Sequence, residues 1–282
     1  MPSMFQRMRQ GWQLTKKSWG VVRSHPQLAK LPLTGGVLAL IAVILFAGPG
    51  IFLVASESDA ARGSGYAMIA VGSYLASFLV IYYNVILAAA ANHALDGREP
   101  DLESAKAVAR NRIPAIAGWA LVSALVSVLL SVLRDRGGLP GRIAASLGAA
   151  IWGLVTFLVI PVLALEGVGP IVAIKRSGSL VRQRWGQQVT GNFVIGGISG
   201  IATLIGVVIA VFGVVLLSGG ATGGAIIGGV LVLVGLALAI AAAVFGGATR
   251  GVFGVALYHF VSEDRAVGPF SNQDLASAAR AR

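Results

Sequence analysis

Residues 225–249 read AIIGGVLVLVGLALAIAAAVFGGAT and contain no Asp, Glu, Lys or Arg. A helix needs about 20 mostly apolar residues to cross the hydrocarbon core of a bilayer. A charged side chain near the centre of such a helix carries a high free-energy cost, and this run has none. The run therefore predicts a membrane-spanning helix.

Five further apolar runs are also free of these four charged residue types: residues 31–55, 67–91, 113–133, 143–165 and 193–217. They are continuous, whereas the strands of a membrane β-barrel would show alternating segments of about ten residues. The sequence therefore predicts an all-α protein, a polytopic transmembrane helix bundle of six spans. Interfacial amphipathic helices are expected on its cytoplasmic side.

The composition fits the same class. Of the 282 residues, 56% are hydrophobic and 12% are charged, against about 45–50% apolar and about 25% charged in soluble domains. This balance disfavours a soluble enzyme and a disordered chain, and we expect no nucleic-acid partner despite the formal charge of +11. The chain has no Cys, which excludes disulfides, thiolate metal ligands and cysteine nucleophiles.

Lys and Arg are unevenly distributed between the spans. Eighteen of the 22 lie before residue 31, within 92–112, within 166–192, or after residue 249. Positive residues favour the cytoplasmic side, so we expect a multi-pass protein of the inner (plasma) membrane with both termini cytoplasmic. Arg134, Arg136 and Arg142 oppose the rule in an outer connection.

These boundaries divide the chain into three parts. Residues 1–30 are predicted to form a basic amphipathic segment in the cytoplasm, and residues 31–262 a six-span membrane domain. Residues 263–282 are predicted to form a disordered cytoplasmic tail.

A basic amphipathic segment precedes each of the three pairs of spans. In the first, Arg9, Lys16 and Arg23 recur at seven-residue intervals beside an apolar stripe of helical spacing: Phe5, Met8, Trp12, Thr15, Trp19 and Val22. In the second, Asp101 is a candidate N-cap, and four residues share the apolar face: Leu102, Ala105, Ala109 and Ile113.

The third segment carries Lys175, Arg176, Arg182 and Arg184 beside an apolar stripe of Ile171, Ile174, Gly178, Val181 and Trp185. Its residues 175–182, KRSGSLVR, resemble residues 16–23, KKSWGVVR. Eight positions do not decide between an internal repeat and the convergence of two basic helices.

Helices of this kind lie in the membrane interface, with apolar residues among the acyl chains and cations among anionic headgroups. We therefore predict that seven residues contact anionic lipid: Arg9, Lys16, Arg23, Lys175, Arg176, Arg182 and Arg184. The alternative is that these cations only orient the protein and anchor the helix ends. The same cytoplasmic face could also receive a protein partner.

Polar residues inside the spans are few. Ser77 and Asn84 share one side of the second span, and Pro161 should bend the fourth. Small polar residues usually serve helix packing. A water-accessible cavity around Ser77, Asn84 and Pro161 would instead favour a transporter.

Motifs for catalysis are missing from the sequence. It contains no Gly-Lys dipeptide for a P-loop, no H-E-x-x-H and no G-x-S-x-G. His93, His259 and Glu166 are all expected on the cytoplasmic side, and an interfacial enzyme would require them to converge. We expect no catalytic residue, no metal and no cofactor.

Residues 166–177 have the pattern E-G-x-G-P-x-x-A-I-K-R-S. With several further blocks of the chain, this pattern resembles an uncharacterised family of six-span prokaryotic integral membrane proteins, classed as a domain of unknown function. The block at 166–177 is its most specific part, and it is also distantly similar to the non-catalytic membrane domains of some glycerophosphodiester phosphodiesterases. The resemblance implies a membrane role and supplies no catalytic residue. Further blocks are residues 96–97, 117–120, 148–152, 161–165 and 184–186.

We therefore expect a non-enzymatic scaffold or accessory protein that contacts anionic lipid at the inner face. A transporter of small molecules or lipids is the first alternative. An interfacial membrane enzyme is the second.

Overall fold

The computed structural model describes residues 4–185, 191–218, 222–272 and 274–275, and it is all-helical over these ranges. It confirms the predicted fold class, because six helical stretches are long and apolar enough to cross a membrane. These stretches are Gln27–Val54, Asp59–Leu95, Ile113–Arg136, Gly138–Leu165, Gly200–Ser218 and Ile226–Glu263.

The spans form three antiparallel pairs. The first consists of α2 (Gln27–Ala42), a π-helical turn η1 (Val43–Ala47), α3 (Gly48–Val54) and α4 (Asp59–Leu95). The second consists of α6 (Ile113–Arg136), α7 (Gly138–Val155) and α8 (Val159–Leu165). The third consists of α10 (Gly191–Ser218) and α11 (Thr222–Glu263).

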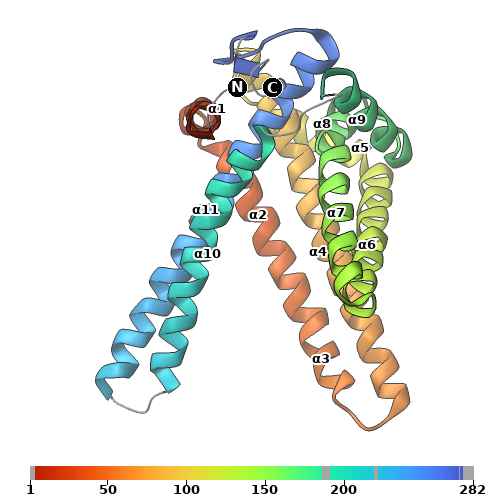
Figure 1. The fold of residues 1–282 in the computed structure, drawn as a ribbon, viewed down its shortest axis with the longest axis vertical. Coiled ribbons are helices and arrows are strands. Elements are labelled where there is room, and N and C mark those ends of the chain that lie inside the picture. Colours follow the sequence, from red (N-terminus) through yellow and green to blue (C-terminus); the bar gives the residue numbers. More distant parts are fainter. Residues whose placement is uncertain (1–3, 186–190, 219–221, 273, 276–282) are drawn as a thin grey trace.

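A further helix precedes each pair, in the order that the sequence predicts: α1 (Met4–Ser24), α5 (Leu102–Asn111) and α9 (Pro170–Trp185). Figure 1 shows these three helices at one end of the molecule, which we call the basic end. The three pairs converge there. Toward the opposite, distal end, α10 and α11 diverge from α2 and α3 (Figure 1).

Each of these three helices packs on the pair that comes before it in the chain. The α5 helix packs on α4 of the first pair, and α9 packs on α6, α7 and α8 of the second. The α1 helix, which has no preceding pair, packs on α10 and α11 of the last. Each of the three helices is joined by the chain to the pair that follows it and packs on a different pair. Together, α1, α5 and α9 therefore link the three pairs in a closed ring.

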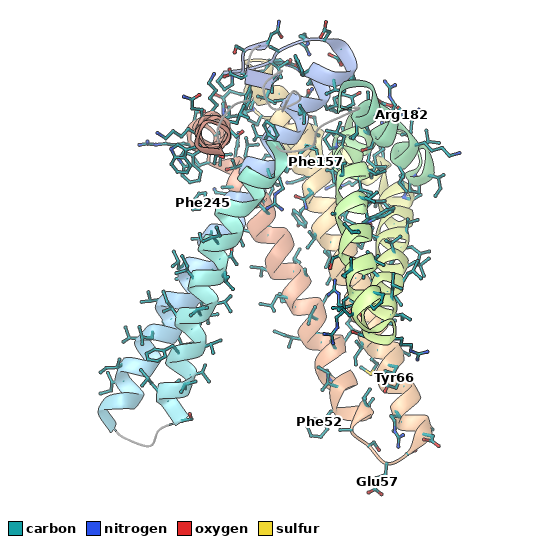
Figure 2. The ribbon with its side chains drawn as sticks, in the orientation of Figure 1. Phe52, Glu57, Tyr66, Phe157, Arg182 and Phe245 are labelled. Atoms are coloured by element: carbon teal, nitrogen blue, oxygen red, sulfur yellow. The ribbon has the colours of Figure 1, made fainter. Side chains whose placement is uncertain are left out.

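The buried core lies at the basic end. Its largest side chains come from all three pairs and include Leu28, Leu87, Leu163 and Phe253, each with relative exposure below 2%. Elsewhere the apolar side chains of the spans are exposed, as Phe52 is at the distal end (Figure 2). Soluble proteins rarely expose apolar patches of this extent, whereas spans present such faces to lipid.

The last span is longer than the sequence predicts. The α11 helix continues past Thr249 to Glu263, and its final turns carry Phe253 and Leu257 into the core. The residues that follow do not match the predicted disordered tail, because Phe270 and Leu275 are also buried. Residues 276–282 of that tail lie outside the described residues.

The α5 helix begins as predicted. The Asp101 carboxylate accepts hydrogen bonds from the backbone N–H groups of Glu103 (2.9 Å) and Ser104 (3.2 Å). The predicted N-cap is therefore confirmed. On the predicted apolar face, Ala105 and Ala109 are buried against the core and Leu102 is partly buried, but Ile113 is exposed.

Glycines bring α10 and α11 into backbone contact. A Cβ atom at Gly235 would collide with the Ala210 nitrogen, and one at Gly213 would lie 2.6 Å from the Gly228 oxygen. Gly229, on the same helix, faces open space, with nothing within 4 Å of its Cβ position. Small residues at such contacts let helix backbones approach closely in lipid.

The substitutions Gly235→Ala and Gly229→Ala should therefore change stability in opposite directions. Overpacking at Gly235 is expected to cost about 1–3 kcal/mol, whereas Gly229→Ala should gain up to about 1 kcal/mol of helix propensity. Thermal unfolding of the two variants in one detergent tests this difference. Equal effects of both substitutions would contradict the glycine contact.

Candidate functional site

The α1 helix lies across the direction of the spans, as Figure 1 shows by viewing it end-on. Its protein-facing side carries Leu14, Ser18 and Val21, which are buried. Its outer side carries Trp12 (45% exposed) and Trp19 (37% exposed). Sequence spacing alone could not show which apolar residues face protein and which face outward.

The exposed aromatic residues of α1 alternate with cations along one face. Trp12, Lys16, Trp19 and Arg23 follow one another at steps of four, three and four residues, and both cations are exposed. The Lys16 Nζ lies 5.5 Å from the centroid of the Trp12 ring. Such a face, with apolar rings and cations side by side, suits a membrane interface.

The α9 helix exposes Lys175 and Arg182, and Figure 2 shows Arg182 at the basic end. Arg176 is engaged instead, because its Nε donates to the Glu166 carboxylate at 3.0 Å. The side chains of the remaining two predicted lipid contacts, Arg9 and Arg184, lie outside the described residues.

The two similar segments of the chain occupy similar environments. Lys16 and Lys175 are exposed, as are Arg23 and Arg182 at the other end of each segment. Ser18 and Ser177 are both fully buried. The intervening cations are both paired: Lys17 with Asp274, and Arg176 with Glu166. The resemblance of the two segments therefore extends from sequence to burial and pairing at these positions.

A break in the fourth span gives Ser177 its role. The α7 helix ends at Val155 and α8 begins at Val159, just before Pro161, which has no N–H to continue the helix. The buried Ser177 hydroxyl donates to the Val155 carbonyl (2.6 Å) and accepts from the Leu158 N–H (3.2 Å). A side chain of α9 therefore satisfies backbone groups that the break leaves open.

Glu166 joins the second and third pairs of spans. Its carboxylate accepts from the Tyr258 hydroxyl of α11 at 2.9 Å as well as from Arg176. The next residue, Gly167, has φ +71°, and its carbonyl accepts from the Arg112 guanidinium at 3.2 Å. A Cβ atom at Gly167 would collide with that guanidinium. The block that carries the family resemblance thus fixes α9 against the spans.

The three groups considered for catalysis have separate partners. The His259 ring nitrogens lie 2.6 Å from Asn92 Oδ1 and 2.9 Å from Glu263 Oε2. His93 accepts from the backbone N–H of Asp101 at 3.4 Å, while Glu166 binds Tyr258 and Arg176. No hydrogen bond joins the three groups, and over the described ranges no three His, Asp or Glu side chains gather as a metal site.

A cavity of about 380 Å³ lies where α2, α4, α8 and α11 converge. Two of the three residues predicted to line a cavity, Asn84 and Pro161, do so. Ser77 does not line it, and its hydroxyl donates to the Ser73 carbonyl within α4 at 2.9 Å. Among the side chains that the structure describes, none forms a hydrogen bond with the Asn84 amide, which leaves it available to the cavity.

The cavity also has a cationic residue that the sequence analysis missed. Arg250 lines it, together with Phe157, which Figure 2 shows beside the converging helices. Arg250 directly follows the apolar run 225–249, so the sequence analysis counts it only among the Lys and Arg residues expected on the cytoplasmic side. The apolar residues that resume at 251–257 were the available signal that the helix continues beyond it.

An ion pair fastens α1 to the C-terminal residues. Lys17 donates to the Asp274 carboxylate, which also accepts from the N–H and hydroxyl of Ser271. Burial alone would raise the pKa of Asp274, but the hydrogen bonds from Lys17 and Ser271 outweigh it, so the pKa lies below its ordinary value. The stabilisation is therefore present above that ordinary value and is lost as pH falls through the folded-state pKa.

The substitution Asp274→Asn should reproduce the protonated state at neutral pH. We expect faster hydrogen exchange in residues 266–275 and a loss of up to about 1 kcal/mol, the usual size for a partly exposed pair. Acidification through the folded-state pKa of Asp274, which lies below the ordinary value of an aspartate, should give the wild type the same exchange pattern. Asp59→Asn, at the exposed distal pair with Arg62, should leave these residues unchanged; if it matched Asp274→Asn, the local role would be refuted.

The model of one protein family matches residues 64–268, which is more than half of the chain. This match agrees with the resemblance to an uncharacterised family and covers the block at 166–177. No curated protein matches the chain, so the similarity to phosphodiesterase membrane domains gains no support. The chain belongs to the family described as "Family of unknown function (DUF6159)".

Proposed function

We propose that this protein is a non-enzymatic membrane scaffold or accessory protein whose basic end contacts anionic lipid at the cytoplasmic surface of the inner membrane. The observation that carries the proposal is the outer face of α1, where Trp12, Lys16, Trp19 and Arg23 alternate on a helix that lies across the spans. A helix in this direction lies parallel to the membrane plane when the spans cross it.

The exposed cations give this contact its strength. Lys16 and Arg23 on α1, and Lys175 and Arg182 on α9, are four exposed positive charges at one end of the molecule. Each cation near an anionic surface contributes about 1 kcal/mol at physiological salt. The proposal gives no direct lipid contact to Arg176, because its charge is paired with Glu166.

The polar contacts at the basic end support a non-enzymatic role. Both ring nitrogens of His259 are engaged by Asn92 and Glu263, and the Glu166 carboxylate already accepts from Tyr258 and Arg176. These contacts join helices, which is a structural use of groups that could otherwise transfer protons.

A carrier for a small molecule or lipid is the second candidate, and the cavity beside Asn84 and Pro161 favours it. Discontinuous helices lining a polar cavity are typical of transporters. Transport would require the cavity to open at the distal end as well. A cysteine at position 84 that reacts with a charged reagent from one side only would count against this candidate.

The proposed orientation can be tested without removing any native cysteine, since the chain has none. A cysteine replacing the exposed Ser58 at the distal end should react with a membrane-impermeant maleimide in intact cells. A cysteine replacing the exposed Glu99, in the turn before α5, should react only after the membrane is opened. The reverse pattern would refute cytoplasmic termini.

The lipid contact can be tested by neutralising its exposed cations. The combined variant Lys16→Gln, Arg23→Gln, Lys175→Gln and Arg182→Gln should lower the number of anionic lipids retained in native mass spectrometry. Its binding to anionic vesicles should also lose most of its salt dependence.

The matched control removes four charges from the distal end: Arg62→Gln, Arg134→Gln, Arg136→Gln and Arg142→Gln. These arginines are exposed but have no neighbouring tryptophan face in the sequence. We expect this control to retain more anionic lipid than the basic-end variant. Equal retention by both variants would show that only net charge matters and would refute the proposed surface.

A further inference from the structure

We propose that the cavity between α2, α4, α8 and α11 binds one anionic phospholipid, with its phosphate at Arg250 and Asn84 and one acyl chain along α2 and α11. This inference rests on the proposed function for the orientation of the basic end. It goes further, because it assigns a defined intramembrane site and two residues that were not among the predicted lipid contacts.

The shape of the site matches an amphiphile. The cavity of about 380 Å³ continues into an apolar groove of about 250 Å³, since Pro32, Gly36 and Ala243 line both. The rest of the groove is aliphatic: Leu33, Val37, Leu40, Ile240 and Val244. Ligand sites in proteins are typically concave, mostly apolar and about 300–1,000 Å³ in volume.

The polar groups are placed at one end of this shape. Arg250 and Asn84 line the cavity, while the groove contains no charged or amide side chain. A guanidinium forms bidentate, charge-assisted hydrogen bonds with phosphate oxygens, and the Asn84 amide can donate to the same phosphate or to a glycerol ester. An apolar small molecule would leave the Asn84 amide unsatisfied and would place no negative charge beside Arg250, which favours an anionic headgroup.

The site has the depth and direction of a lipid in the leaflet at the basic end. Phe245 of α11 contacts Trp19 of the interfacial helix α1, with ring centroids 4.6 Å apart. Arg250 follows five residues later, about 7.5 Å farther along the helix toward the basic end. The groove residues Ile240 and Val244 lie on the other side, toward the bilayer centre. A phosphate at Arg250 would therefore lie at headgroup level with its chain pointing inward.

Gly36 of α2 is a position at which a larger side chain would block the site without disturbing the packing of the helices. Gly36 lines both the cavity and the groove, and nothing lies within 4 Å of its Cβ position. A leucine there would occupy the space assigned to the lipid. Gly48 of α3 also has open space at its Cβ position but lines neither the cavity nor the groove, so it offers a matched control.

The test titrates the full-length protein in mild detergent with phosphatidylglycerol or phosphatidylcholine and counts bound lipids by native mass spectrometry. The wild type should retain one phosphatidylglycerol at high collision energy. Arg250→Gln should weaken this binding about tenfold to a hundredfold, the usual effect of losing a charge-assisted contact. Arg250→Lys should weaken it less, and Gly36→Leu should weaken both lipids while Gly48→Leu weakens neither.

Unchanged retention in both Arg250→Gln and Gly36→Leu would overturn the inference, as would displacement of the lipid by millimolar inorganic phosphate, which would identify a simple anion site. A mass spectrum that shows a dimer of the protein in place of the protein with one bound lipid would also overturn it.

The variant with four neutralised cations separates this inference from the proposed function: it should lose loosely held lipids but keep the single tightly bound one. If Arg250→Gln releases the tightly bound lipid but the variant with four neutralised cations loses no lipid, the proposed surface contact is refuted and the cavity site is supported.

Discussion

The apolar core at the basic end is the place where all three pairs of spans pack together. Leu28, Leu87, Leu163 and Phe253 come from four different helices and meet there with almost no exposure. In lipid, exposed aliphatic side chains provide no hydrophobic drive for helix association, so the pairs can diverge toward the distal end (Figure 1). The cavity beside Asn84 lies where this divergence begins, and its presence follows from the confinement of the core to one end.

The sequence predicted the spans and the N-cap at Asp101 because single physical requirements specify them: hydrocarbon thickness in one case and unsatisfied N–H groups in the other. It could not distinguish the two apolar sides of α1, since Trp12 and Val21 are both apolar, yet Trp12 is exposed and Val21 is buried. Arg250 was missed for a related reason. A charge at the end of an apolar run looks like the end of a span, and only tertiary packing shows that α11 continues to Glu263.

The block at residues 166–177 shows how a motif can be specific without being catalytic. Glu166 joins α9 to α11, Gly167 makes room for Arg112, and Ser177 satisfies the backbone at the break before Pro161. Each residue has a different structural role. Satisfying the backbone matters most in lipid, where an unsatisfied N–H or C=O group raises the free energy of the fold by several kcal/mol. The identity of these residues could be read from the sequence, but the partners could not, because Arg112, Val155 and Tyr258 are distant in the chain.

The ring of contacts closed by α1 also constrains the order of assembly. The α1 helix is synthesised before the α10–α11 pair on which it packs. During translation its Leu14 and Val21 side therefore has no native partner, and the bilayer surface is the available apolar phase for it. The native contacts of α1 can therefore form only after α10 and α11 have been made.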